Sequence, residues 1–418
     1  MRESTSRSRS CSRDSSRHSG DKRSPVHSHS ARSSGGYHHS YRHSPRDSHL
    51  REAYHGHRHY RYRAKDRHHR SGSSHSESEY DDSKGNFIGE AGDILDGRYR
   101  IVKELGTGTF ARAFEVCDLT SGYHYAMKIV RAVHDYSDSA RIEARIAEDI
   151  THRDPDHSSC CYHIYDHFEF SGHFCMVTDL LGPSLYKVLQ NNNYHPYPMR
   201  FIRPILSDIL KGLRFLHGFG LTHTDLKLEN VLFNSPAGEE KWTNHRDQSV
   251  YLPSCRHFTL IDYGSATYAS ERRHGVINTR QYRAPEVLLG MEWYEASDLW
   301  GVGCIGLELF VGDVLFQTHD DLLHLALIER IIGSIPFRLI EGASHARRRF
   351  FNERGFVRID LLHHSEREHV RDSLTLRETV GSAFPQFYDL MSRCLMIDPK
   401  KRISAADALK HPFFLGRD

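Results

Sequence analysis

The chain has 418 residues, 38% of them hydrophobic, and a formal net charge of +2. This composition suits a soluble globular protein with room for two or three domains. Its eight cysteines form no C-x-x-C pair and no apolar signal segment precedes them, so we expect reduced thiols in a nuclear or cytosolic protein. The longest apolar run, LWGVGCIGLELFVG, is too short to cross a bilayer and contains Glu308, so we expect no membrane association.

Residues 1–92 read as a basic tail dominated by arginine, serine and histidine. Residues 1–70 hold 17 Lys and Arg against 6 Asp and Glu, which leaves residues 71–418 with a net charge of −9. This segment contains few apolar side chains. Their burial could not offset the conformational entropy that the chain would lose on folding. The composition therefore predicts a disordered Arg/Ser/His-rich segment in front of a mildly acidic body.

The body opens with strand patterns. The segments RYRIVKELG, ARAFEVCDL and YHYAMKIV alternate apolar and polar residues between glycine-containing turns and predict a three-strand meander from residue 99. In SDSARIEARIAEDITH, Ile142, Ile146 and Ile150 recur every four residues, which predicts a helix with an N-cap within residues 137–139. A further strand, FCMVTDLLG, ends in a turn at Gly182.

The chain then becomes helical. MRFIRPILSDILKGLRFLHGFG predicts a long amphipathic helix that stops at Gly218 and Gly220. Its apolar stripe consists of Ile202, Ile205, Leu206, Ile209, Leu213 and Leu216. A small β-rich lobe followed by a larger helical lobe leaves a cleft between them, which is a usual place for a ligand.

Two features of the β-rich lobe suit phosphate binding. In GTGTFARAF, Gly106 and Gly108 would let backbone N–H groups approach phosphates, although an ordinary glycine-rich hairpin turn fits the same residues. Lys128, at the inner end of a strand, could be a surface lysine that reaches water. Glu143 on the next helix could instead pair with it, and a Lys–Glu pair holding phosphate oxygens is what phosphoryl transfer requires.

The segment LTHTDLKLENVLF concentrates the remaining chemistry. Asp225, Lys227 and Asn230 suit a loop with a base for a hydroxyl proton, a cation for the moving phosphoryl group and an amide ligand for Mg²⁺. The strand FTLIDYG then ends in Asp262, and a carboxylate at that edge is a ligand for a hard cation. Each residue alone could be a solvated loop side chain, but their order favours the chemical interpretation.

These motifs carry a resemblance. GTGTF, AMK, HTDLKLEN, DYG and YRAPE resemble, in order, the signature set of a eukaryotic protein kinase over residues 99–414. HTDLK, DYGSATY, NTRQYRAPE and residues 323–333, which match the motif EHLAMMERILG, resemble the CDC-like or LAMMER dual-specificity kinases more closely. The resemblance implies an α+β, bilobal protein kinase fold behind the tail, with an N-lobe at about 99–178 and a C-lobe at about 182–414.

The family resemblance also assigns roles to residues. It implies that Asp225 is the catalytic base, that Lys227 is the partner of the γ-phosphate, and that Asn230 and Asp262 are Mg²⁺ ligands. The ATP-binding set that it implies is Leu105, Gly106, Thr107, Gly108, Thr109, Phe110, Ala111, Ala113, Lys128, Glu143, Asp179 and Leu181.

Further positions receive supporting roles from the same resemblance. Thr279 would bridge Asp225 and Lys227, Glu286 and Arg402 would form a buried ion pair, and Asp298 would brace the catalytic loop. Residues 234–257 match a family insertion.

The sequence departs from the usual kinase pattern at several positions. Thr224 replaces an arginine that collects an activation-loop phosphate, and threonine cannot form a bidentate phosphate pair, so we expect a loop ordered without phosphorylation. Ala111 and Ala113 replace a glycine and a valine of the nucleotide loop. The other departures are Tyr263 for phenylalanine, Leu228 for proline, and Thr178 for the gatekeeper phenylalanine usual in this family.

The predicted function is ATP- and Mg²⁺-dependent phosphorylation of serine and threonine, with tyrosine autophosphorylation as an additional possibility. The resemblance places Glu229 where kinases bind an arginine of the peptide substrate. Together with the excess acidic charge of the body, this suggests Arg/Ser-rich splicing factors as substrates. We expect a monomer located in the nucleus and also in the cytoplasm. Two alternatives stay open: a pseudokinase scaffold, which the altered glycine loop would favour, and an RNA-binding splicing protein whose tail makes weak, salt-sensitive phosphate contacts.

Overall fold

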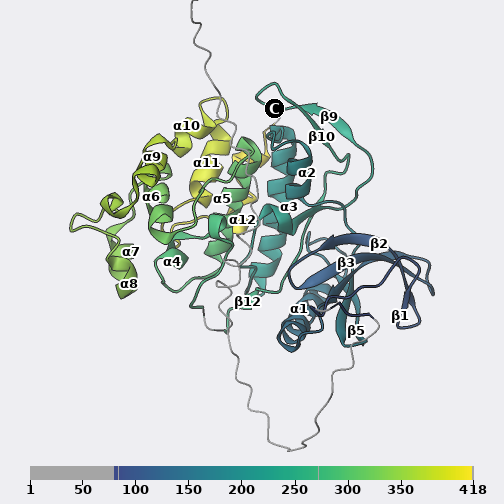
Figure 1. Cartoon of the computed structure of the whole chain (residues 1–418). Coiled ribbons are helices and arrows are strands. Elements are labelled where there is room, and N and C mark those ends of the chain that lie inside the picture. The colour runs from purple at the N-terminus through teal and green to yellow at the C-terminus, as the bar shows by residue number, and fades with distance from the viewer. Residues whose placement is uncertain (1–79, 83, 272, 417–418) are drawn as a thin grey trace, which may run out of the picture. The chain divides into compact units, whose positions relative to one another are not determined.

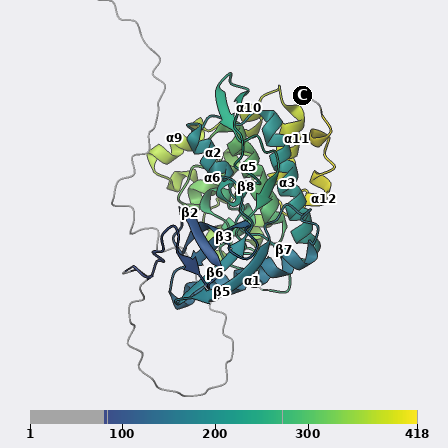
Figure 2. The ribbon, with the colours of Figure 1, turned by 90° about the vertical axis from the view of Figure 1, so that its right-hand side faces the viewer.

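The computed structural model describes residues 80–82, 84–271 and 273–416, all within one unit of the chain. The tail prediction for residues 1–79 lies outside the described residues. The described chain has a β-rich part, which carries helix α1, and a helical part (Figures 1 and 2). The expected α+β, bilobal kinase fold is confirmed.

The β-rich part is a six-stranded sheet with the order β1-β2-β3-β4-β6-β5. Its strands are β1 Ile94–Leu95, β2 Tyr99–Thr107, β3 Ala111–Asp118, β4 His124–Val130, β5 Ile164–Phe170 and β6 His173–Thr178. All neighbours are antiparallel, and Lys128 pairs with Ala113 of β3 and Met176 of β6. The predicted meander is therefore β2–β4, and this register places Lys128 in the middle of the sheet.

Residues 80–92 differ from the expectation that they continue the tail. Phe87 is 1% exposed and packs edge to face against Phe114 of β3, with ring centroids 5.7 Å apart. An ion pair of 2.6 Å joins Asp81 to the fully buried His173 of β6. Tyr80 also packs edge to face on Phe170 of β5, with centroids 5.2 Å apart, so aromatic packing and the Asp81–His173 contact attach a polar segment to the sheet, which its overall composition did not indicate.

Helix α1 spans His134–Arg153 and starts three residues before the predicted cap region. Val133 occupies the N-cap position without a side-chain hydrogen bond, so the predicted cap within residues 137–139 is wrong. Ile146 and Ile150 are buried as predicted, but Ile142 is 49% exposed. The buried face also includes Glu143, which points inward because the small residues Ala140, Ala144 and Ala147 line the same face.

The helical part follows the connecting residues 179–184. Its main helices are α2 Leu185–Asn191, α3 Met199–Gly218, α5 Ala296–Val311, α6 Asp321–Ile331, α9 His364–Asp372 and α11 Pro385–Cys394. Shorter ones are α4 Pro285–Leu288, α7 Phe337–Gly342, α8 His345–Arg348, α10 Leu376–Val380 and α12 Ala405–Ala408. All six predicted stripe residues of α3 are buried, and the chain leaves the helix through Gly220 at φ +79°.

Short antiparallel strand pairs accompany these helices. They are β7 Leu221–Thr222 with β12 Thr267–Tyr268, β8 Val231–Phe233 with β11 Phe258–Leu260, and β9 Glu240–Thr243 with β10 Ser249–Leu252. The β9–β10 hairpin forms most of the predicted insertion at residues 234–257 and projects from the helical part (Figure 2).

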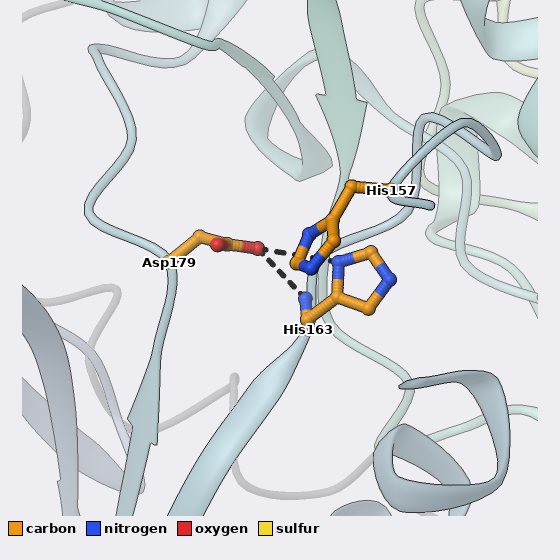
Figure 3. A group of neighbouring side chains, drawn as sticks. All are labelled: His157, His163 and Asp179. Carbon is orange, nitrogen blue, oxygen red and sulfur yellow. Dashed lines mark hydrogen bonds and ion pairs between the residues drawn. The ribbon is translucent and has the colours of Figure 1, made fainter. Parts of the chain in front are cut away.

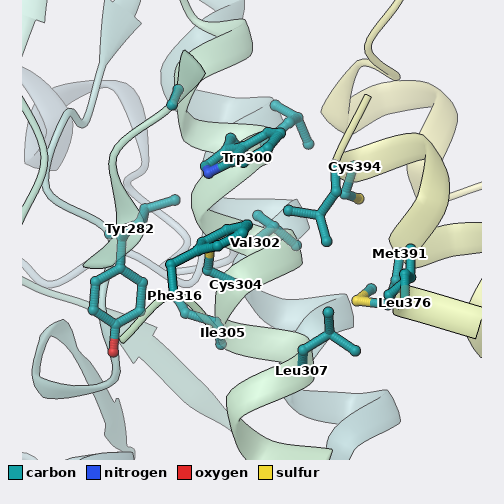
Figure 4. Packing of buried hydrophobic residues seen from close by; sticks show 14 of the residues in the cluster. Tyr282, Trp300, Val302, Cys304, Ile305, Leu307, Phe316, Leu376, Met391 and Cys394 are labelled. Atoms are coloured by element: carbon teal, nitrogen blue, oxygen red, sulfur yellow. The ribbon is translucent and has the colours of Figure 1, made fainter. Parts of the chain in front are cut away.

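Helix α5 forms the centre of the helical core, as its apolar run predicted. Trp300 stacks on Phe316, and Leu307 lies near Met391 of α11 (Figure 4). No helix among the described residues is long and apolar enough to cross a membrane.

A separate apolar cluster joins the two parts. It contains Ala147 and Ile150 of α1, Leu216 of α3 and Tyr263, all essentially inaccessible to solvent. Tyr263 follows Asp262 directly, so the position of α1 is coupled to that of the Asp262 segment through apolar packing.

Candidate active site

The predicted catalytic loop runs from β7 to β8 through a short 3-10 helix, Leu228–Asn230. The fully buried Asp298 of α5 holds the backbone of this loop in place. The Asp298 carboxylate accepts the backbone N–H groups of His223 and Thr224, both at 2.9 Å, and faces His217 Nε2 at the same distance. These three contacts hold the loop in the conformation that presents Asp225.

Asp225, Lys227 and Thr279 form one hydrogen-bonded group. Lys227 Nζ donates to Asp225 Oδ2 at 2.6 Å and to Thr279 Oγ1 at 3.4 Å. Thr279 donates to Asp225 Oδ1 through its backbone N–H at 3.0 Å and its hydroxyl at 2.8 Å. Burial lowers the pKa of Lys227, but the Asp225 carboxylate outweighs it and the pKa is raised, so the ammonium stays charged.

Asn230 and Asp262 are the predicted Mg²⁺ ligands, and the backbone N–H of Ile261, just before Asp262, donates to the Asn230 carbonyl at 3.0 Å. Asn230 Nδ2 donates to the backbone carbonyl of Asp225 at 3.0 Å, and this bond leaves the amide oxygen as the atom for a cation. Asp262 has a left-handed backbone, φ +70°. Burial raises the pKa of its carboxyl, but Lys128 and Lys227 outweigh this, so the pKa is lowered and the group is an anionic oxygen donor.

The predicted Lys128–Glu143 pair is formed. Lys128 Nζ donates to both carboxylate oxygens of Glu143 at 2.8 Å and lies 3.8 Å from Asp262 Oδ1. Burial lowers the pKa of Lys128, yet the two carboxylates outweigh it and raise the pKa, which keeps the lysine charged. A Cβ added to Gly264 would lie 3.3 Å from Glu143 Oε2, so only a small residue suits the position where these elements meet.

The glycine loop joins β2 to β3. Gly108 N–H donates to the carbonyl of Ala111 at 2.8 Å, and the Phe110 ring packs edge to face on Tyr136 of α1, with centroids 4.9 Å apart. A Cβ added to Gly106 would meet nothing within 4 Å, and Gly106 has no positive φ. Neither the packing nor the backbone conformation of the protein therefore requires glycine at position 106. A ligand that approaches the backbone closely would explain the glycine, because any side chain there would stand in its way.

The connecting residues place the rest of the expected nucleotide set. Thr178 ends β6, and its hydroxyl lies 3.5 Å from the Ala126 carbonyl. The Asp179 carboxylate is already engaged, because it accepts the His163 N–H at 2.8 Å and the Tyr165 hydroxyl at 2.6 Å. Each oxygen accepts one of these bonds and keeps a further lone pair, and the two bonds together fix the orientation of the carboxylate. Leu181 is half-buried in the same segment.

Two aromatic residues complete the site. Tyr263 stacks on Tyr162 with centroids 4.7 Å apart and 5° between the rings, and its hydroxyl donates to the Leu260 carbonyl at 3.3 Å. Tyr162 in turn donates to Glu143 Oε1 at 3.3 Å. The sequence analysis missed Tyr162, since nothing in the pattern CCYHIYD separates a ring that orients a carboxylate from an ordinary strand residue.

The expected buried ion pair is also present. Arg402 donates to the Glu286 carboxylate through both terminal nitrogens, at 2.7 and 2.9 Å, and both side chains are fully inaccessible. Its remaining donors reach the carbonyls of Ala296 and Met396 at 2.7 and 2.9 Å. The pair therefore ties the end of the segment that follows Asp262 to the helical core.

Comparison with known proteins agrees with this geometry. Residues 99–414 match the protein kinase domain family. The chain is 38% identical over 342 residues to dual specificity protein kinase lkh1 of Schizosaccharomyces pombe, an alignment that covers 81% of this chain and 50% of that one. It is 38% identical over 347 residues to dual specificity protein kinase CLK2 of Mus musculus, covering 82% and 69%.

A solved structure shares the fold. The crystal structure of a kinase domain at 33% identity superposes with a TM-score of 0.75 and covers 80% of this chain and all of that one. The chain spans half the length of the S. pombe relative and somewhat more than two thirds of mouse CLK2. Family match, identity and site geometry agree, and the chain therefore belongs to the protein kinases, within the CDC-like dual-specificity group.

Proposed function

We propose that this chain transfers the γ-phosphoryl group of ATP to serine and threonine hydroxyls of proteins. The observation that carries this proposal is the Asp225–Lys227–Thr279 group, in which a carboxylate and an ammonium lie 2.6 Å apart in a rigid loop. Phosphoryl transfer needs positioned charges more than covalent chemistry, and these charges are held by the fold itself.

The residues present suit Mg²⁺. Asp262 supplies an anionic oxygen and Asn230 an amide oxygen, which are the hard donors that this cation prefers. When bound, Mg²⁺ would supply positive charge that offsets the negative charge of the ATP phosphates, and Asp262 and Asn230 are the residues that would hold it. Lys128 Nζ lies 3.8 Å from Asp262 Oδ1, and the positive charges of Lys128 and Lys227 both favour the ionised carboxylate that the cation needs.

The residues around the expected nucleotide also have consistent roles. Lys128, fixed by Glu143, is a charged donor for phosphate oxygens, and Gly106 leaves open backbone for close approach. Asp225 accepts the hydroxyl proton of the substrate, while Lys227 neutralises charge on the transferred group. Thr279 donates to Asp225 and so fixes the orientation of the carboxylate.

We further propose Arg/Ser-rich proteins, splicing factors among them, as the substrate class, with a nuclear site of action for a monomeric enzyme. Glu229 supports this because it is solvent-exposed next to the catalytic loop and follows Lys227 by two residues, where an arginine of a peptide could pair with it. The relatives' printed names include dual specificity, which supports tyrosine as a secondary acceptor.

The test is ATP turnover by the full chain with an Arg/Ser peptide. We expect Asp225→Asn to lower kcat by about 10²–10⁴-fold, the usual contribution of a general base. The matched control is Asp247→Asn, the same change at an exposed position between β9 and β10, which should leave the rate unchanged. Equal rates for wild type and Asp225→Asn would contradict the proposal and favour a scaffold role.

The substrate class is tested separately. Replacement of the peptide arginines by alanine should raise KM for the wild-type enzyme, and Glu229→Gln should remove most of that discrimination. A KM that does not respond to either change would leave the kinase activity standing and overturn the Arg/Ser preference.

A further inference from the structure

Two imidazoles and one carboxylate come together in a group that contains none of the predicted catalytic or Mg²⁺-binding residues. His157, His163 and Asp179 each offer one ligand atom, and the three atoms lie within 4.8 Å of one another (Figure 3). His157 comes from the loop before β5 and Asp179 from the connection after β6. No step of the proposed phosphoryl transfer uses these side chains.

The surroundings of His163 are those of a metal ligand. Its side chain is 3% exposed, and its Nε2 lies 3.2 Å from a carboxylate oxygen of Asp154, which is itself 4% exposed. A metal-binding histidine typically directs its second ring nitrogen to such a carboxylate, which fixes the tautomer.

The opposite side of His163 lacks a good hydrogen bond. Nδ1 lies 3.7 Å from Asp179 Oδ2, too far for an N–H···O bond, and that oxygen already accepts the His163 backbone N–H. The His157 ring lies beside His163, with centroids 3.9 Å apart. Burial lowers the pKa of His163, but Asp179 and Asp154 outweigh it and raise the pKa, so a bound cation must displace a proton from this imidazole.

The site is accessible to solvent. A cavity of about 490 Å³ is lined by His157, His163 and Asp179, together with Cys160 and Lys211. His157 is exposed on a turn with φ +52°, so its ring can rotate toward the other two ligands. Tetrahedral zinc with N and O ligands needs bonds of about 2.0–2.2 Å, which requires this closure.

We propose that His157, His163 and Asp179 bind a divalent transition-metal cation, zinc in the first place, with water as the fourth ligand. Two imidazoles and one carboxylate are a ligand set that zinc accepts. Bound metal would cross-link the loop before β5 to the segment that connects the two parts of the chain, and so stiffen that connection. The proposal does not rest on the proposed kinase activity.

The experiment measures thermal unfolding of the full chain, first stripped with EDTA and then titrated with ZnCl₂ alone. A cation that binds the folded state raises Tm by mass action, so we expect a rise of several degrees in the wild type. His157→Ala and Asp179→Asn should lose that rise. Because wild type and variants share the same histidine-rich residues 1–79, zinc bound there cancels in the comparison.

The matched control is His167→Ala. His167 lies on β5 and pairs with Glu148 at 2.9 Å, an imidazole–carboxylate contact with no place in the proposed ligand set, so the zinc-induced rise should persist. Co²⁺ provides a second readout, since its visible absorption should show tetrahedral coordination in the wild type and not in His157→Ala. An unchanged wild-type Tm, or an equal rise in His157→Ala, would overturn the proposal.

Discussion

Thr224 Oγ1 donates a hydrogen bond of 2.7 Å to the backbone carbonyl of Ser265, three residues after Asp262. Its own carbonyl accepts the Asn278 side chain at 2.7 Å and the Asn278 backbone N–H at 3.0 Å. Thr224 is fully buried and thus holds both ends of the segment between Asp262 and Glu286. In regulated kinases an arginine at this position binds a phosphate of the activation loop. In this protein Thr224 holds the same segment through hydrogen bonds that need no phosphate.

Activity should therefore not depend on phosphorylation of the segment between Asp262 and Glu286. We expect phosphatase-treated enzyme to keep its initial rate, because the hydrogen bonds of Thr224 already order the segment. Loss of most activity after treatment, restored by rephosphorylation within that segment, would contradict this expectation.

Thr224→Val should destabilise the protein, because it keeps the side-chain shape but removes the shorter of two hydroxyl donors to the Ser265 carbonyl and leaves Thr267 Oγ1 at 3.3 Å. Loss of one such hydrogen bond costs about 0.5–1.5 kcal/mol, which urea unfolding can measure. We expect Thr224→Val to lower kcat as well, because Thr224 orders the segment after Asp262. Thr259 is another buried threonine, and its hydroxyl donates to the side chain of Asn234. Thr259→Val is therefore the control for loss of a hydroxyl and should lower stability without lowering kcat.

Removal of one member of the Glu286–Arg402 pair should be strongly destabilising. Arg402→Met leaves the Glu286 carboxylate buried without its partner, and such a change costs about 3–5 kcal/mol. The double variant Glu286→Gln/Arg402→Met should recover part of this loss, because no charge is then left unpaired. Urea unfolding would decide: a double variant no more stable than Arg402→Met would rule out charge burial as the main cause.

The gatekeeper should control inhibitor size. Thr178 lies at the end of β6 and is small, so we expect Thr178→Phe to weaken bulky ATP-site inhibitors about tenfold or more while ATP binding changes little. Inhibitor and nucleotide affinities measured on both proteins would test this, and equal inhibitor affinities would count against it. Thr178→Ser is the matched control and should behave as wild type.

Glu308 should make stability depend on pH. Burial raises the pKa of this carboxyl to about 8, and Tyr282 donates to it. The folded state therefore holds a proton that the unfolded state releases near pH 4.5, so stability falls as the pH rises from about 4.5 to 8, by at most about 1.4 kcal/mol per pH unit. Glu308→Gln should flatten this slope in unfolding experiments at several pH values; an unchanged slope would exclude Glu308 as its source.

Local patterns were sufficient for much of the fold. The alternation in β2–β4 and the stripe of α3 follow from residue order, because each element must bury one face. Periodicity gave a wrong result where packing against a neighbouring element determines which residues are buried. Ile142 matches the period of α1 but is exposed, since the face that packs on the sheet is shifted toward the alanines and Glu143.

For this protein, the sequence by itself determined the order and identity of the chemical groups: lysine, glutamate, aspartate, lysine, asparagine and aspartate in the kinase arrangement. Only the tertiary structure decided which groups meet. The stacking of Tyr162 on Tyr263, the two-ended role of Thr224 and the His157–His163–Asp179 group join residues from separate elements. Such contacts depend on how packed surfaces align in space, and periodicity along a chain carries no information about that alignment.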